Sequence, residues 1–231
     1  DERLETVGAQ TAKKLGNYFR AGITIGLAWG STISSVSRHM HYFPVAGSTV
    51  VQLNGAGNDH STGLSYSGEI LNQFGKSLGA SVVHFPVPAF FDDPEAKQAM
   101  WRERSTKRIL DIQQRIDLAL FGLGRIDSEV PSQVYAAGYL GTEEIDDLNK
   151  EQVAGDIATV FFRKDGSWSD ISLNERSSGP SLSQLKKASK RICVISGLAK
   201  IEALEGALAG GLITDLFIDD LTAEKLMETA S

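Results

Sequence analysis

The chain has 231 residues and a mass of 24.9 kDa, with 42% hydrophobic and 23% charged residues. This size suits one large α/β domain or two small ones. A formal net charge of −6 excludes the broad positive field that draws proteins onto nucleic acid. No apolar run approaches the ~20 residues that span a bilayer, and the N-terminus lacks a signal-peptide pattern, so no membrane partner is expected.

Residues 1–20 form the first predicted element, a helix whose apolar positions recur at helical spacing. The chain starts without Met and reads as a processed or truncated product, so we expect a further domain upstream. The single cysteine, Cys193, lies in an apolar run and is expected to be buried. One cysteine excludes a disulfide within the chain and fits a cytoplasmic protein.

Strands and helices then alternate along the chain. The predicted strands are 23–28, 48–55, 80–88, 116–124, 191–196 and 212–220. The predicted helices begin near Ser31, run from about Tyr66 to Leu78, form one or two segments within 94–115, and run from Gly197 to about Ala209. This alternation predicts an α/β fold with a doubly wound, mostly parallel sheet.

One region breaks the alternation. Two β-like runs within 158–173 are separated by Lys164-Asp165-Gly166, which predicts an antiparallel hairpin at the edge of the sheet. No linker composition divides the chain and no internal repeat is present. We therefore expect a single domain over residues 1–231.

The first candidate site follows the strand at 23–28, where Gly30 precedes Ser31 and Thr32. A strand, a glycine turn and a hydroxyl-capped helix start direct several N–H groups and the positive end of a helix dipole at one point. Such a point suits a phosphate or a sugar hydroxyl. The alternative is an ordinary turn with a serine cap.

Three further strand ends carry suggestive residues, and ligands of open α/β sheets bind at such ends. Asn54-Gly55 follows the second strand, and Gly124 allows close backbone approach. Lys200 lies in the first turn of a helix, where a cation opposes the helix dipole. An anionic ligand would explain its position. Solvation of Lys200, or pairing with a nearby glutamate (Glu202 or Glu205), remains the alternative.

Asp156, before a β-like run, suits either sugar hydroxyls or the capping of a turn. His39 and His41 lack a Cys or carboxylate cluster that would complete a metal site. Signatures of serine hydrolases, P-loop proteins and dinucleotide-binding proteins are also missing. We therefore expect neither a metal nor an organic cofactor.

The motifs GLAWGSTI, VVQLNGAG, FPVPAFFDDPE, IDLALFGLG, VAGDIATVFFRKDG and SGLAKIEALEGALAGGLITDLFIDDLTAEKLM, in this order, resemble the SorC family of bacterial transcriptional regulators. The resemblance covers essentially the whole chain and is to the C-terminal effector-binding domain. It implies a fold like glucosamine-6-phosphate deaminase and ribose-5-phosphate isomerase, without catalysis. It also implies a small-molecule sugar, polyol or sugar-phosphate effector and a homo-oligomer, dimer or tetramer. Operator DNA would be bound only by a helix-turn-helix domain upstream.

The resemblance also implies a set of ligand-binding residues. These are Gly30, Ser31, Thr32, Asn54, Gly55, Ser67, Asp156 and Lys200, and the strand-end argument adds Gly124. The first three would hold a phosphate or terminal hydroxyl, Asp156 the sugar hydroxyls, and Lys200 the phosphate or an anomeric oxygen. Relatives that bind phosphosugars often have a basic residue where this chain has Asn54. One positive charge fewer favours a monophosphate over a bisphosphate and leaves an unphosphorylated ligand open.

Two functions remain. The first is an effector sensor, which needs only different affinities in two oligomeric states. The second is a sugar-phosphate isomerase or deaminase on the same fold. An enzyme would need a general base, and Asp156 is the one acidic candidate near the expected pocket, with no histidine beside it.

Overall fold

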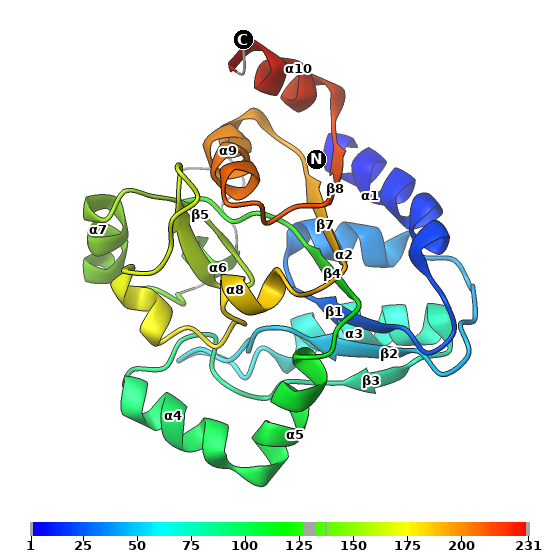
Figure 1. Ribbon diagram of the computed structural model, residues 1–231, viewed down its shortest axis with the longest axis horizontal. Helices are drawn as coiled ribbons and strands as arrows, with labels where there is room; N and C mark the ends of the chain where they lie inside the picture. The colour runs from blue at the N-terminus through cyan, green and yellow to red at the C-terminus, as the bar shows by residue number, and fades with distance from the viewer. Residues whose placement is uncertain (1, 127–132, 137, 230–231) are drawn as a thin grey trace.

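The computed structural model describes residues 2–126, 133–136 and 138–229. Its core is a six-stranded, entirely parallel sheet in the order β3-β2-β1-β4-β7-β8 (Figure 1). The strands are β1 (Thr24–Leu27), β2 (Thr49–Gln52), β3 (Ser81–Val83), β4 (Leu118–Phe121), β7 (Lys190–Ile195) and β8 (Asp215–Ile218). The predicted α/β sheet is confirmed, with strands shorter than the apolar runs because the runs continue into buried turns.

Helices cover both faces of the sheet. The longer ones are α1 (Glu2–Leu15), α2 (Ser31–Arg38), α3 (Leu64–Leu78), α4 (Pro94–Arg102), α5 (Arg104–Gln113), α7 (Thr142–Lys150), α9 (Ile201–Ala209) and α10 (Asp220–Thr229). The short ones are α6 (Gln133–Ala136), α8 (Leu182–Leu185) and the 3₁₀ turns η1 (Gly16–Tyr18), η2 (Ser172–Glu175) and η3 (Leu198–Lys200). The segment 94–115 thus forms two helices.

Alternating side chains of each strand divide the core between the two faces. Leu118 and Leu120 of β4 pack with the cluster that includes α1, α2 and α3, whereas Ala119 and Phe121 pack with α5, α8 and α9. This period of two follows from the pleat of a strand. A parallel sheet covered on both faces needs apolar residues at nearly every position, which explains the continuous run 116–124.

The hairpin was predicted in the wrong place. A separate two-stranded antiparallel sheet is formed by β5 (Val153–Ile157) and β6 (Val160–Arg163), with Ala158 and Thr159 as its turn. The Lys164-Asp165-Gly166 sequence does make a tight turn, in which the Gly166 N–H donates to the Arg163 carbonyl. That turn follows β6 and returns the chain toward η2, so no strand partner comes after it. The hairpin lies beside the main sheet, below α9 in Figure 1.

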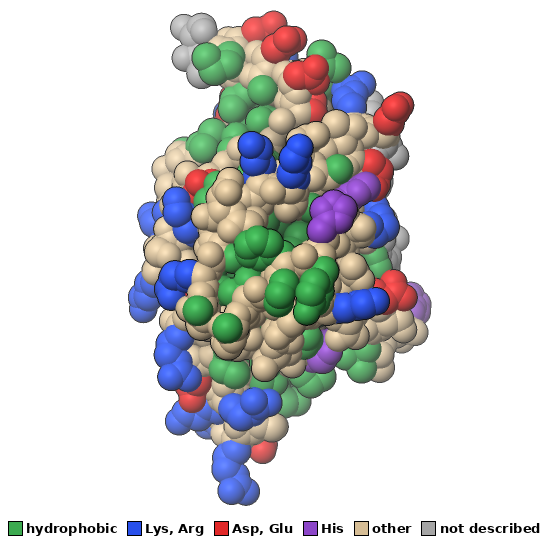
Figure 2. Space-filling view, turned by 90° about the vertical axis from the view of Figure 1, so that its right-hand side faces the viewer, with side chains coloured by type: hydrophobic (Ala, Val, Ile, Leu, Met, Phe, Trp, Pro, Cys, Tyr) green, Lys and Arg blue, Asp and Glu red, His purple; other side chains and the backbone are tan. Residues whose placement is uncertain are grey.

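Apolar side chains also reach the surface. The loop after α2 exposes Tyr42 and Phe43, and Figure 2 shows hydrophobic side chains gathered on that side of the molecule with lysines and arginines around them. Among the described residues, no helix is both long and apolar enough to cross a bilayer.

Candidate functional site

A cavity lies where the winding of the sheet reverses. The chain passes from β1 to β2 and β3, and then crosses to β4 on the other side of β1. Ligands of such sheets bind at this switch point, beyond the carboxyl ends of the strands. The cavity holds about 50 Å³ and is lined by Ala28, Trp29, Gly30, Ser31, Thr32, Ile33, Asn54, Gly122, Leu123, Gly124, Val134, Asp156, Ala158, Thr159 and Lys200.

The start of α2 forms one end of the cavity. Gly30 precedes the helix as its N-cap, and no side chain within the described ranges caps it, so the predicted serine cap is not found there. The first helical bond runs from the Ser34 N–H to the Gly30 carbonyl, at 2.8 Å. The N–H groups of Ser31, Thr32 and Ile33 therefore lack acceptors within the helix. Together with the helix dipole, they make this end of the cavity suited to an anion.

Lys200 enters the cavity from the turn after β7. Gly197, with a φ of 112° that side chains rarely adopt, allows this turn. Its N–H donates to Asp219 Oδ2 (3.0 Å) and Thr222 Oγ1 (3.1 Å), which fixes the turn to the start of α10. Lys200 is only 9% exposed, and desolvation lowers the pKa of its ammonium group.

The two glutamates that follow Lys200 in the sequence form ion pairs with other residues. Glu202 forms an ion pair with Arg125 at 2.8 Å, and Glu205 forms one with Lys164 at 2.9 Å. Within the part of the chain that the structure describes, the Lys200 ammonium group has neither an ion pair nor a hydrogen bond. The charge of Asp156 attracts the ammonium group and acts to raise its pKa. A buried cation without a hydrogen-bond partner is still costly unless an anion or a polar ligand meets it.

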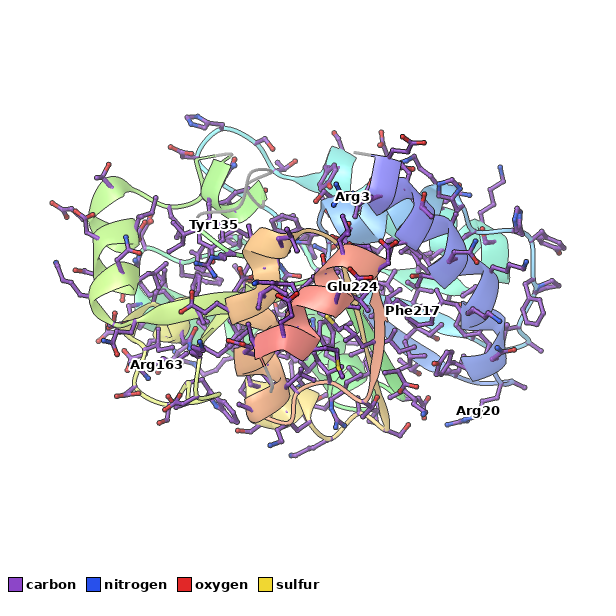
Figure 3. All side chains as sticks on the ribbon, turned by 90° about the horizontal axis from the view of Figure 1, so that it is seen from above. Arg3, Arg20, Tyr135, Arg163, Phe217 and Glu224 are labelled. Atoms are coloured by element: carbon purple, nitrogen blue, oxygen red, sulfur yellow. The ribbon has the colours of Figure 1, made fainter. Side chains whose placement is uncertain are left out.

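Asp156 also lines the cavity, and it lies inside β5 rather than before a strand. Its Oδ1 accepts from the Tyr135 hydroxyl (3.0 Å; Figure 3 labels Tyr135) and its Oδ2 from the Thr159 N–H (3.2 Å). It therefore does hold a turn, as the capping alternative proposed, while facing the cavity. Desolvation raises the pKa of Asp156 to about 6, although these two bonds and the charge of Lys200 act to lower it.

Gly124 brings the hairpin to the main sheet. Its N–H donates to the Asp156 carbonyl (3.0 Å), and the Asp156 N–H donates back to the Gly124 carbonyl (3.2 Å). A Cβ on Gly124 would lie 1.8 Å from Asp156 Oδ1, so the carboxylate occupies the space that a side chain would take. The close approach predicted for this glycine is thus made to Asp156.

Asn54 lines the cavity after β2, and its buried Oδ1 has no hydrogen-bond partner among the residues that the structure describes. The indole Nε1 of Trp29 fixes this loop by donating to the carbonyls of Asn54 (3.2 Å) and Gly55 (2.9 Å). A free amide oxygen in a polar cavity can accept a hydrogen bond from a ligand hydroxyl.

Two predicted residues do not line the cavity. Gly55 lies beside it, and its N–H donates to Ser178 Oγ at 2.9 Å. Ser67 is fully buried on α3, where its hydroxyl donates to the Gly63 carbonyl at 2.9 Å. Both residues support the loop between β2 and α3 rather than facing the cavity.

Trp29, Tyr135 and Thr159 are site residues that the sequence reasoning missed. Trp29 stands next to Gly30 inside the first motif, so its position was an available signal. Thr159 likewise lies inside the motif VAGDIATVFFRKDG, three residues after Asp156, whereas Tyr135 comes from a segment without a periodic pattern and carries no such signal. Metal-binding clusters of three His, Cys, Asp or Glu residues are not found in the described ranges. His39 contacts Glu5, at 3.0 Å.

Comparison with known proteins identifies the family. The family described as "Putative sugar-binding domain" matches residues 1–228. The deoxyribonucleoside regulator of Bacillus subtilis is 32% identical over 206 residues, which are 89% of this chain; the chain spans 64% of that relative's length.

Solved structures agree with this assignment. A structure described as "a domain of a possible sugar-binding transcriptional regulator" from Arthrobacter aurescens TC1 is 50% identical, with a TM-score of 0.92 over 97% of this chain and 86% of that one. The full-length sorbitol operon regulator SorC of Klebsiella pneumoniae is 25% identical, with a TM-score of 0.89 over 98% of this chain and 74% of that one. The chain therefore belongs to this family of sugar-binding domains, and the resemblance of its motifs to SorC-type regulators is confirmed.

Proposed function

We propose that the cavity binds a phosphate monoester of a sugar or polyol, and that the domain is the effector sensor of a transcriptional regulator. One observation carries the ligand class. The buried ammonium group of Lys200, without a partner among the described residues, shares a cavity with the uncapped start of α2. Both groups need a negative charge, and a phosphate satisfies both.

Other groups that line the cavity suit the sugar. The free Oδ1 of Asn54 and the carboxylate of Asp156 are hydrogen-bond acceptors, and hydroxyl groups are the donors that match them. Lys200 is the one cationic residue among the lining residues that the structure describes. A single cation with helix N–H groups balances a monophosphate but not a bisphosphate.

The cavity of about 50 Å³ is smaller than the several hundred Å³ typical of ligand pockets. The effector therefore has to select or induce a more open state. A ligand that prefers one of two states by 1–3 kcal/mol, the typical coupling range, changes the equilibrium by roughly 5–150-fold. We propose that the two states are different homo-oligomers, dimer or tetramer, which differ in their affinity for operator DNA.

Names of relatives support this regulatory role. They include a deoxyribonucleoside regulator, a sorbitol operon regulator and an erythritol catabolism regulatory protein. DNA would be bound by a separate domain, since this chain has a net charge of −6. A protein with this role acts in the cytoplasm and performs no chemistry on its effector.

An isomerase or deaminase activity is the second candidate, favoured by one observation. A carboxyl group with a pKa of about 6, as at Asp156, is poised for proton transfer near neutral pH. Product analysis of sugar phosphates incubated with the chain separates the two functions. Turnover abolished by Asp156→Asn would establish an enzyme, and its absence with any ligand that binds supports the sensor.

The test of the ligand class is a thermal-shift screen with matched pairs: D-ribose and D-ribose 5-phosphate, sorbitol and sorbitol 6-phosphate, erythritol and erythritol 4-phosphate. A ligand at 100 times its Kd stabilises the folded state by about 2.7 kcal/mol. For a chain of this length that raises the Tm by roughly 5–10 °C. We expect shifts from phosphorylated members alone. Shifts confined to the free sugars or polyols would overturn the phosphate assignment.

A further inference from the structure

The turn between β5 and β6 has an unusual backbone. Ala158 and Thr159 both adopt left-handed conformations, with φ of 50° and 67°. A two-residue hairpin turn of this kind is normally made by Asn-Gly or another glycine-containing pair. A β-branched residue such as threonine is a genuine outlier there. Both residues line the cavity, and backbone strain of this kind clusters at functional sites.

The Thr159 side chain holds the turn in this conformation. Its hydroxyl donates to the Ala158 carbonyl (2.5 Å) and lies 3.0 Å from Ser177 Oγ, which in turn accepts from the Gly179 N–H (3.2 Å). Thr159 and Ser177 are each 1% exposed. The hydroxyl is therefore engaged by the protein itself and anchors the turn to a second buried segment.

The anchored turn fixes Asp156. The Thr159 N–H donates to Asp156 Oδ2, while the Tyr135 hydroxyl donates to Oδ1. The peptide that carries this N–H is the one between Ala158 and Thr159, so the bond to Asp156 lasts only while the turn keeps its conformation. The orientation of Asp156 thus depends on a backbone conformation that threonine resists and its hydroxyl enforces.

We propose that Thr159 is a positioning residue of the effector site, whose strained and anchored turn fixes the Asp156 carboxylate in the orientation that takes the sugar hydroxyls. The identity of the ligand rests on the proposed function, whereas the geometry of the turn does not. Thr159 affects how selectively the cavity holds a hydroxylated ligand, and makes no contact with the phosphate.

Three substitutions separate this role from its alternatives. Thr159→Val keeps the β-branched strain and removes the anchor. Thr159→Gly removes both, because glycine adopts positive φ freely, and Thr159→Ser keeps the anchoring hydroxyl. If Thr159 is a positioning residue, Thr159→Val should weaken ligand binding most of the three. Thr159→Gly and Thr159→Ser should then bind the ligand more nearly as the wild type does. A packing role would make Gly the worst and the isosteric Val harmless. A direct hydroxyl contact with ligand would make Gly and Val equally poor.

The first readout needs no ligand. Titration of the Asp156 carboxyl carbon by NMR should give a higher pKa in Thr159→Val than in the wild type, because the carboxylate loses an N–H bond. The groups facing Asp156 from other elements, Tyr135 and Lys200, are unchanged in all variants. Thr159→Gly should lie closer to the wild type than Thr159→Val does.

The second readout is calorimetric binding of D-ribose 5-phosphate and of inorganic phosphate. Thr159→Val should weaken the sugar phosphate at least tenfold and inorganic phosphate less than twofold. Thr6→Val, the same substitution on the exposed side of α1, is the control. The positioning role would be overturned if Thr159→Val lost affinity equally for both probes, or if Thr159→Gly bound the sugar phosphate most weakly of the three variants. If the wild type binds neither probe, the proposed ligand class fails, and the carboxyl titration still decides the role of Thr159.

Discussion

Lys200 and Asp156 line the same buried cavity but form no ion pair with each other. Lys200 comes from η3 after β7, and Asp156 from β5, an element outside the main sheet. Both are desolvated: Lys200 would gain from a hydrogen-bond partner, and Asp156 from a further donor beside Tyr135 and Thr159. A ligand with an anion at one end and hydroxyl groups at the other supplies both partners at once, which an ion pair between the two residues would prevent.

Replacing Lys200 by methionine should separate phosphate recognition from sugar recognition. A hydrogen bond to a charged group contributes roughly 1.5–3 kcal/mol. Lys200→Met should therefore weaken a sugar phosphate by about 10–150-fold and its unphosphorylated parent by less than threefold. The unliganded domain should become more stable, since a desolvated charge is removed.

Isothermal titration calorimetry with both members of a ligand pair measures this difference. Lys187→Met, at an exposed position after α8, is the matched control and should change neither affinity. An equal loss for the phosphate and its parent would refute the assigned role of Lys200.

Asp156 should make stability depend on pH with an unusual sign. Its pKa is raised from 3.8 to about 6 in the folded state, mainly by desolvation. Between these values the folded state holds a proton that the unfolded state has lost, so stability falls as pH rises from about 4 to 6. The loss is on the order of 3 kcal/mol and is fully present above pH 6. Asp156→Asn should remove it, raise the Tm at pH 7.5, and weaken binding of hydroxylated ligands.

Urea unfolding at a series of pH values tests this sign. Asp165→Asn is the control, because the pKa of Asp165 is lowered by its bonds to Ser167 and its side chain is exposed. In Asp165→Asn the free energy of unfolding should still fall between pH 4 and 6, as it does in the wild type. The prediction fails if Asp156→Asn retains the same decline as the wild type.

The sheet and several residues of the site were predictable because their signals are local. Apolar runs ending in glycine or polar residues placed Gly30, Asn54, Gly124 and Lys200 at strand ends, and parallel strands bring such ends to one edge. All four line the cavity. Lys200 was predicted both from its place at a strand end and from the family resemblance. Its burial without a hydrogen-bond partner could not be read from any spacing pattern.

What could not be predicted depends on contacts between distant segments. Thr159 lies in a turn that glycine normally occupies, so turn preferences pointed instead to Lys164-Asp165-Gly166. Ser67 was placed at the ligand by resemblance, but its hydroxyl is used inside α3. The Asp156 carboxylate is held by Tyr135 from a four-residue helix, too short to leave a periodic signal.

Gly124→Ala should displace the Asp156 carboxylate without removing it. The new Cβ would lie 1.8 Å from Oδ1 and 2.8 Å from Cγ, so the side chain must rotate away from Tyr135. We expect at least a tenfold loss of affinity for a sugar phosphate, and a loss of about 1–3 kcal/mol in unfolding free energy, as for other overpacked sites. Gly57→Ala is the matched control, because its Cβ would meet nothing closer than 3.5 Å. Full affinity in Gly124→Ala would show that the orientation of Asp156 does not matter.

Trp29→Phe tests whether the loop after β2 is held by the indole. Trp29 donates to the carbonyls of Asn54 and Gly55 and packs on Tyr139, with ring centroids 5.4 Å apart. Phenylalanine keeps most of the apolar surface but leaves two buried carbonyls without this donor. We expect the unfolding free energy to fall by about 1–3 kcal/mol, with an unchanged m-value in urea. Trp168→Phe is the comparison, since the Trp168 indole has the Lys186 ammonium group over its ring and makes no Nε1 hydrogen bond to the described part of the chain. If both substitutions cost the same, ring packing rather than the indole N–H holds the Asn54 loop in place.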